Sequence, residues 1–161
     1  MTQQNAQPLF YKKPTPIQRE LHQEGGLSKN INYLFAKNTN SVPITAPEFG
    51  TVSKFYPIVF TSDNYPVAVL GLNGALNDFV NIKGEWQKDV YIPAYVRRYP
   101  FAFSGNEDKL VLCFDESSER YKKKAVNNDF PFFQGEKPST LIDSALQFCA
   151  DYMRDHKATA K

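Results

Sequence analysis

The sequence contains few of the residues that carry most enzyme chemistry. Its 161 residues include two cysteines, Cys113 and Cys149, and two histidines, His22 and His156. None of them has partners at the spacing of a metal site, so we expect no metal. A Ser/His/Asp or Cys/His catalytic set is poorly supported for the same reason. No glycine-rich phosphate loop or dinucleotide fingerprint occurs, and no cofactor is expected.

The sequence also lacks a large excess of charge of one sign, and it lacks long apolar runs. The net charge is +2, from 19 Lys and Arg against 17 Asp and Glu, which argues against nucleic acid as a partner. No apolar stretch is long enough to cross a bilayer, so no transmembrane segment is expected. The N-terminus "MTQQNAQPLFYKKP" lacks the pattern of a secretory signal. These absences predict a cytoplasmic protein whose cysteines are free, buried thiols; a disulfide between them is the second alternative.

Aromatic residues are plentiful. Thirteen Phe and nine Tyr help to bring the aromatic fraction to 14%, which is too high for a disordered chain. The length suits one domain over residues 1–161 with a core of its own. Residues 1–7 are polar, and we expect them to be disordered. The following segment, "PLFYKKPTPIQRE", predicts an extended arm laid over the domain.

Short stretches rich in β-branched residues predict antiparallel strands. Short links between successive strands favour antiparallel pairing, because parallel strands need long crossovers. Asn73-Gly74 is a hairpin signal. We expect a meander of about five strands, with two shorter extended pieces before it near Asn32–Ala36 and Ser41–Ile44. The five strands are expected at Tyr56–Thr61, Pro66–Leu72, Asn77–Ile82, Pro100–Ser104 and Lys109–Asp115.

Three segments predict helices. Thr45 and Glu48 form a capping-box pair at the start of a short helix over Ala46–Lys54. A second short helix is expected from Pro93 to Tyr99, where Pro100 ends it. From Ser139 to about His156, apolar residues recur with the helical period. The fold class is therefore α+β, an antiparallel β-meander sheet packed by a C-terminal helix and a short helix. The segment before the last helix, "SSERYKKKAVNNDFPFFQGEKP", is expected to be a long, partly ordered excursion of the chain, that is, a long loop.

The segment "YIPAYVRRYPFAF" holds the strongest candidates for a binding site. Arg97 and Arg98 could clamp an anion such as a carboxylate, since guanidinium groups bind such groups at two points. Tyr91, Tyr95 and Tyr99 could stack on the ligand or donate hydroxyl groups to it. The structural alternative is that one arginine pairs with an internal carboxylate while the rings pack. Adjacent helical residues face different ways, so at most one arginine is expected to be structural.

Asp115 and Glu116 follow the apolar run "KLVLCF" and are the second group of candidates. At the end of a strand they could serve as general acid and base. The alternative is that "DESSE" caps the exit of the strand and starts a helix. Adjacent carboxylates alone do not make a catalytic site.

Several stretches together carry a family resemblance. They are "PLFYKKPTP", "NYLFAKNTNSVPITAPEF", "YPIVF", "PVAVLGLNGALNDFVN", "YIPAYVRRYPFAF", "LVLCFDESS" and "PSTLIDSALQF". Their order and spacing resemble the SapC family of bacterial proteins, over about residues 8 to 150. The resemblance implies a cytoplasmic protein with a historical association with bacterial surface layers, and it supplies no catalytic motif.

Together these observations predict a non-enzymatic binding or accessory protein. It would present the Tyr91–Phe103 segment to a protein partner or a small anionic ligand. The alternative is an enzyme, or the accessory subunit of one, acting on an amino acid or peptide. In that case Asp115 or Glu116 would be the acid/base, and Arg97 or Arg98 would clamp a carboxylate.

Overall fold

The computed structural model describes residues 8–106 and 109–160, and the prediction that residues 1–7 are disordered lies outside this range. The chain groups into two compact units. The first unit comprises Met1–Asn30 and Tyr99–Leu146, and the second comprises Ile31–Arg98 and Gln147–Lys161. Each unit thus combines two separate stretches of sequence. The expectation of one domain over residues 1–161 stays a prediction.

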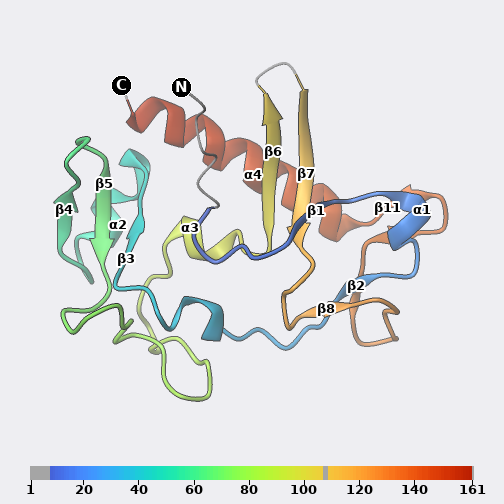
Figure 1. Cartoon of the computed structure of the whole chain (residues 1–161), viewed down its shortest axis with the longest axis horizontal. Helices are drawn as coiled ribbons and strands as arrows, with labels where there is room; N and C mark the ends of the chain where they lie inside the picture. The colour runs from blue at the N-terminus through green and yellow to red at the C-terminus, as the bar shows by residue number, and fades with distance from the viewer. Residues whose placement is uncertain (1–7, 107–108, 161) are drawn as a thin grey trace. The chain divides into compact units, whose positions relative to one another are not determined.

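The first unit contains a three-stranded antiparallel sheet in the order β1-β7-β6 (Figure 1). Strands β6 (Phe101–Asn106) and β7 (Lys109–Asp115) lie where the sequence predicts them, and Phe101 pairs with Phe114. Strand β1 (Pro14–Pro16) belongs to the N-terminal arm and pairs with the C-terminal end of β7. Proline is tolerated there because β1 is an edge strand. The expected arm is therefore bound as a strand.

The expected excursion before the last helix is more regular than its sequence indicates. Short strands pair in the order β8-β2-β9, and a further pair joins β10 to β11. Gly26 lies in the central strand, where an added Cβ would collide with the Phe130 carbonyl oxygen. Only glycine permits this close approach of backbones. The bounds are β2 Gly26–Leu27, β8 Tyr121–Lys122, β9 Phe130–Pro131, β10 Phe133–Gln134 and β11 Lys137–Pro138.

Aromatic side chains form the core of the first unit. Phe114 and Phe132 are fully buried, with ring centroids 5.0 Å apart. The ring of His22, from α1 (Arg19–His22), stands edge-on to Phe114. Tyr121 stacks on Phe132. Such ring pairs add about 0.5–1.5 kcal/mol beyond the area that they bury. The first unit therefore has an aromatic core, and both cysteines of the chain are free and buried, as expected.

The second unit has its own antiparallel sheet, in the order β3-β5-β4 (Figure 1). Strands β3 (Ser41–Pro43), β4 (Ile58–Phe60) and β5 (Pro66–Val69) lie within predicted segments. The two central positions, Val42 and Ala68, pair directly and are fully buried. The antiparallel pairing is thus confirmed, although the strands belong to several small sheets.

Two predicted extended segments are wrong. Residues 77–82 form turns with a single bridge between Val80 and Trp86. The side chain of Asn77 accepts the N–H of Phe79, and an asparagine bonded to its own backbone competes with strand pairing. Residues 34–36 form a 3-10 helix, η1 (Leu34–Ala36), which the Asn32 side chain starts by accepting the Leu34 N–H.

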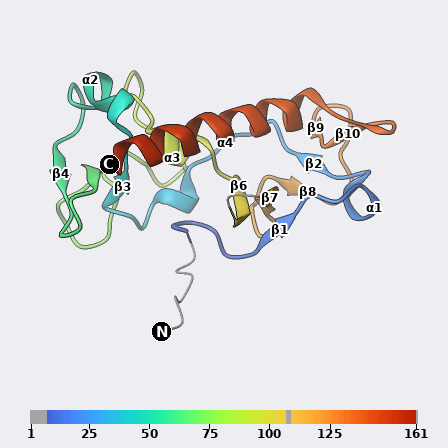
Figure 2. The ribbon, with the colours of Figure 1, turned by 90° about the horizontal axis from the view of Figure 1, so that it is seen from above.

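The three predicted helices are present. The first is a 3-10 turn, η2 (Ala46–Glu48), followed by α2 (Phe49–Val52), and the capping box of Thr45 and Glu48 is formed. The second is α3 (Ala94–Arg97). The third, α4 (Thr140–Thr159), is drawn end to end in Figure 2. One of its apolar residues, Leu146, is 39% exposed. Within the described residues no helix combines the length and apolar character needed to span a membrane. The α+β class is confirmed.

Candidate functional site

The two neighbouring arginines have different surroundings. Arg97 is exposed, yet its guanidinium is held in place. Nε donates to the carbonyl oxygen of Ile92 at 2.9 Å, and Nη2 donates to the hydroxyl of Tyr91 at 3.0 Å. The group lies 5.5 Å from the ring centroid of Tyr91 and 5.2 Å from that of Phe148. Among the described residues Nη1 has no hydrogen-bond partner, so its two N–H groups remain available to a ligand.

Arg98 is half-buried between two rings. Its guanidinium lies 4.3 Å from the centroid of Tyr95 and 4.6 Å from that of Tyr152. Tyr95 and Arg98 are three positions apart and therefore share a helix face. Burial raises the pKa of Tyr152, and the charge of Arg98 opposes that rise. Arg98 is therefore packed into the aromatic interior of the second unit, whereas Arg97 lies at its surface.

Glu48 connects the capping box to the segment that carries the arginines. Its Oε2 accepts the N–H of Thr45 at 2.9 Å and the Thr45 hydroxyl at 3.0 Å. Its Oε1 accepts the hydroxyl of Tyr91 at 3.0 Å and the N–H of Ala94 at 2.8 Å. Glu48 as a whole residue is 7% exposed. A buried carboxylate needs such donors, and these four link η2 to the start of α3.

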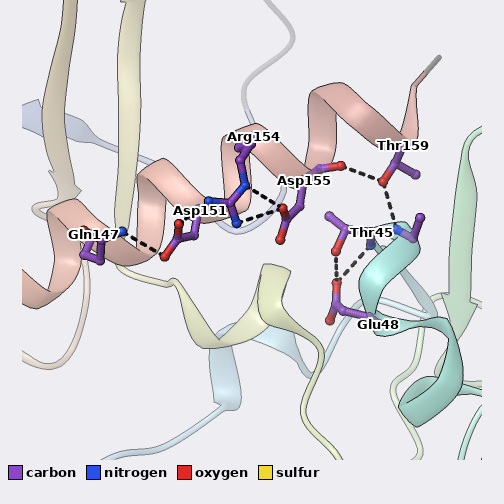
Figure 3. Close-up of polar contacts among 8 residues, drawn as sticks. Thr45, Glu48, Gln147, Asp151, Arg154, Asp155 and Thr159 are labelled. Atoms are coloured by element: carbon purple, nitrogen blue, oxygen red, sulfur yellow. Dashed lines mark hydrogen bonds and ion pairs between the residues drawn. The ribbon is translucent and has the colours of Figure 1, made fainter.

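A pocket of about 340 Å³ opens between these elements and α4 within the second unit. Its size lies at the lower end of small-molecule sites. Figure 3 draws four of the lining residues, Thr45 and Glu48 of one segment and Asp151 and Asp155 of α4. The lining residues are Thr45, Pro47, Glu48, Thr51, Tyr91, Ala94, Arg97, Phe148, Asp151, Tyr152 and Asp155.

The α4 wall carries two carboxylates that share one cation. Arg154 contacts Asp151 at 2.7 Å and Asp155 at 3.1 Å (Figure 3). The side chain of Gln147 also donates to Asp151, at 3.0 Å. This bond, helped by the charge of Arg154, lowers the pKa of Asp151. Asp155 receives its bonds on Oδ1 alone, and no described residue donates to Oδ2.

Tyr91 lies between the opposite charges of Glu48 and Arg97. Burial and the charge of Glu48 raise the pKa of Tyr91, while Arg97 acts in the opposite direction. The phenol is thus protonated near neutral pH. It can donate to Glu48 and accept from Arg97 at the same time. This chain of bonds sets the position of the Arg97 guanidinium.

Tyr99, Asp115 and Glu116 belong to the first unit. Asp115 is fully buried. Its carboxylate accepts five hydrogen bonds: the N–H groups of Lys12 and Lys13, the hydroxyl of Tyr99, and both the N–H and the hydroxyl of Ser117. Burial alone would raise the pKa of Asp115, but bonds from Lys12, Ser117 and Lys13 outweigh it and leave the pKa lowered. Asp115 therefore anchors the N-terminal arm.

Glu116 forms an ion pair with Lys13 of the same arm at 2.7 Å. Asp115 and Glu116 are bonded to residues of the first unit, and Arg97 is bonded to residues of the second unit. Of the candidates predicted from sequence, Arg97 and Tyr91 line the pocket together. Tyr95 and Arg98 pack against each other.

Sequence reasoning missed the contribution of α4 to the pocket. Phe148, Asp151, Tyr152 and Asp155 recur at intervals of three and four residues, so they share a helix face. That spacing can be read from the sequence. The sequence does not show, however, which residues face this side of α4 across the pocket. Glu48 was identified only as a capping partner. Within residues 8–106 and 109–160, no group of three or more His, Cys, Asp or Glu side chains could hold a metal ion.

Comparisons with known proteins match the chain to a protein family. Searches of the curated proteins and of the solved structures find nothing similar to this chain. The model of the SapC family matches residues 17–161, so the arm segment "PLFYKKPTP" precedes the matched region. The match includes every residue that lines the pocket. The chain belongs to the SapC family.

Proposed function

We propose that the chain is a non-enzymatic binding or accessory protein of the cytoplasm, and that it holds a small anionic ligand in the pocket beside Arg97. The observation that carries the proposal is the state of the Arg97 side chain. It is fixed by Ile92 and Tyr91 and backed by two rings, and its Nη1 has no partner among the described residues. A guanidinium positioned in advance binds a carboxylate with little further loss of side-chain entropy.

The buried carboxylates favour binding over catalysis. A general base needs an oxygen that can take a proton from a substrate. Both oxygens of Glu48 already accept two donors each, and Asp115 accepts five. These groups hold segments of the chain in place. This weighs against the enzymatic alternative, in which Asp115 or Glu116 would act as acid/base on an amino acid or peptide.

The biological setting in this proposal follows the family. The SapC name carries an association with bacterial surface layers, and a cytoplasmic binding protein would serve such a process by delivering or sensing a small precursor. The ligand that the pocket accepts is the property that can be measured directly. Native mass spectrometry of the freshly purified protein would detect any small molecule that accompanies it.

The test uses a carboxylate probe and its neutral counterpart. We expect 3-phenylpropanoate to shift the backbone amide NMR signals of Thr45, Ala94 and Phe148, and 3-phenylpropanamide to shift them far less. Hydrogen bonds to charged groups contribute about 1.5–3 kcal/mol, so Arg97→Ala should weaken the carboxylate at least tenfold. Arg19→Ala is the matched control, because Arg19 is also exposed and pairs with one carboxylate, that of Glu136. Equal binding of acid and amide, or unchanged binding by Arg97→Ala, would overturn the proposal.

A further inference from the structure

The pocket contains more negative than positive charge. Glu48, Asp151 and Asp155 line it, and Arg97 is the one cationic side chain among the lining residues. Arg154 lies outside the lining and divides its guanidinium between two of the carboxylates. Like charges close together disfavour one another unless a cation separates them. An occupant that carried only negative charge would therefore meet an attractive group at Arg97 and repulsive groups at the α4 wall.

Asp155 is the carboxylate best placed to bind a cation. Its side chain is 28% exposed, against 43% for Asp151, so it is the less hydrated of the two. Its Oδ1 is bound by Arg154, and no described residue donates to Oδ2. Figure 3 shows this carboxylate directed toward Thr45 and Glu48, across the pocket. A carboxylate oxygen in this position accepts a hydrogen bond from an ammonium group readily.

The remaining lining is apolar. The rings of Tyr91, Phe148 and Tyr152, with Pro47 and Ala94, surround the charged groups. The guanidinium of Arg97 lies over two of these rings, those of Tyr91 and Phe148. A site with a few fixed polar groups and apolar walls is typical of small-molecule recognition. The lining thus matches a ligand with one anionic group, one cationic group and an apolar body.

We infer that the ligand is an α-amino acid, or a molecule with the same charges, that bears an apolar side chain. Its carboxylate binds Nη1 of Arg97, its ammonium group binds Oδ2 of Asp155, and its side chain packs against Phe148 and Tyr152. This inference rests on the proposed function, because it keeps the carboxylate at Arg97. It adds the ammonium group as a requirement, and that requirement can fail independently.

Three probes that differ in one charged group each test the inference. They are L-phenylalanine, 3-phenylpropanoate, which lacks the ammonium group, and 2-phenylethylamine, which lacks the carboxylate. Isothermal titration calorimetry at pH 7 should rank L-phenylalanine first, with each of the other two at least tenfold weaker. If 3-phenylpropanoate binds as tightly as L-phenylalanine, the inference is wrong and the proposed function stands. If 2-phenylethylamine binds as tightly as L-phenylalanine, or if none of the three probes binds, both the inference and the proposed function are wrong.

A pair of variants separates recognition from folding. Asp155→Asn should weaken L-phenylalanine at least tenfold while leaving 3-phenylpropanoate unchanged or bound more tightly, because the repulsion of its carboxylate is reduced. A purely structural effect would weaken both probes together and would overturn the inference. Asp89→Asn is the matched control. Asp89 is exposed, does not line the pocket, and has a positive φ of 60° that asparagine tolerates.

Discussion

Oε1 of Glu48 accepts the backbone N–H of Ala94 at 2.8 Å, across 46 positions of the chain. Glu48 completes the capping box of η2 through Oε2, and through Oε1 it fixes the start of α3. Arg97 lies one turn further along that second helix. The position of the proposed anion-binding group consequently depends on a carboxylate that never needs to touch the ligand.

Replacement of Glu48 tests this dependence. Glu48→Ala leaves four donors without their acceptor in a buried site, so we expect the free energy of unfolding to fall by more than about 2 kcal/mol. Urea denaturation followed by circular dichroism measures the change. Glu48→Gln keeps the volume and should lose less, since its amide oxygen still accepts. A loss below about 0.5 kcal/mol for Glu48→Ala would show that water replaces these bonds at little cost.

The two arginines should separate in a comparison of stability with binding. Arg98→Ala removes contacts to two rings, each worth about 0.5–2 kcal/mol, and should lower the melting temperature by several degrees. Arg97→Ala removes an exposed group and should change the melting temperature little while it weakens binding of the carboxylate probe at least tenfold. Thermal unfolding and NMR titration of both variants provide the measurements. Equal destabilisation by the two substitutions would contradict the assignment of different roles.

Asp115 should make the stability of the first unit depend on acid pH. Its pKa is lowered in the folded protein, whereas the unfolded chain takes up this proton near pH 3.9. Unfolding therefore takes up a proton at acid pH. The stabilisation that Asp115 contributes is fully present above about pH 3.9 and is lost as the pH falls through that value toward the lower pKa of the folded protein. Asp115→Asn should flatten the dependence below pH 5 in denaturation curves. It should also speed amide hydrogen exchange at Lys12 and Lys13, and unaltered exchange there would argue against an anchor for the arm.

His156 should have an effect of the same sign at higher pH. Desolvation and the charge of Arg98 lower the pKa of His156, and its Nδ1 is hydrogen-bonded with the Tyr65 hydroxyl. The folded protein therefore favours the neutral ring. The unfolded chain gains a proton near pH 6.5, so the free energy of unfolding should decrease as the pH falls below that value. His156→Gln should remove this slope between pH 7 and 5, measured by urea denaturation, and a slope that persists in this variant would contradict the role of His156.

Much of the local structure could be predicted because it depends on neighbouring residues. The capping box of Thr45 and Glu48 is formed by side chains three positions apart. The β-branched stretches became β4, β5 and β7, and α4 follows from a period that recurs over several turns. The prediction failed at 77–82, where Asn77 bonds to nearby backbone and ends the extended conformation.

The sequence by itself determined the SapC family, the α+β class and the segment that carries the arginines. The tertiary structure alone decided that Arg97 is exposed while Arg98 is packed between rings, and that Glu48 and Asp155 line one pocket with Arg97. The physical reason is that helical periodicity specifies which residues share a face, but not what that face will meet. Contacts between residues about 50 positions apart arise from packing, and packing leaves no repeated pattern along the chain.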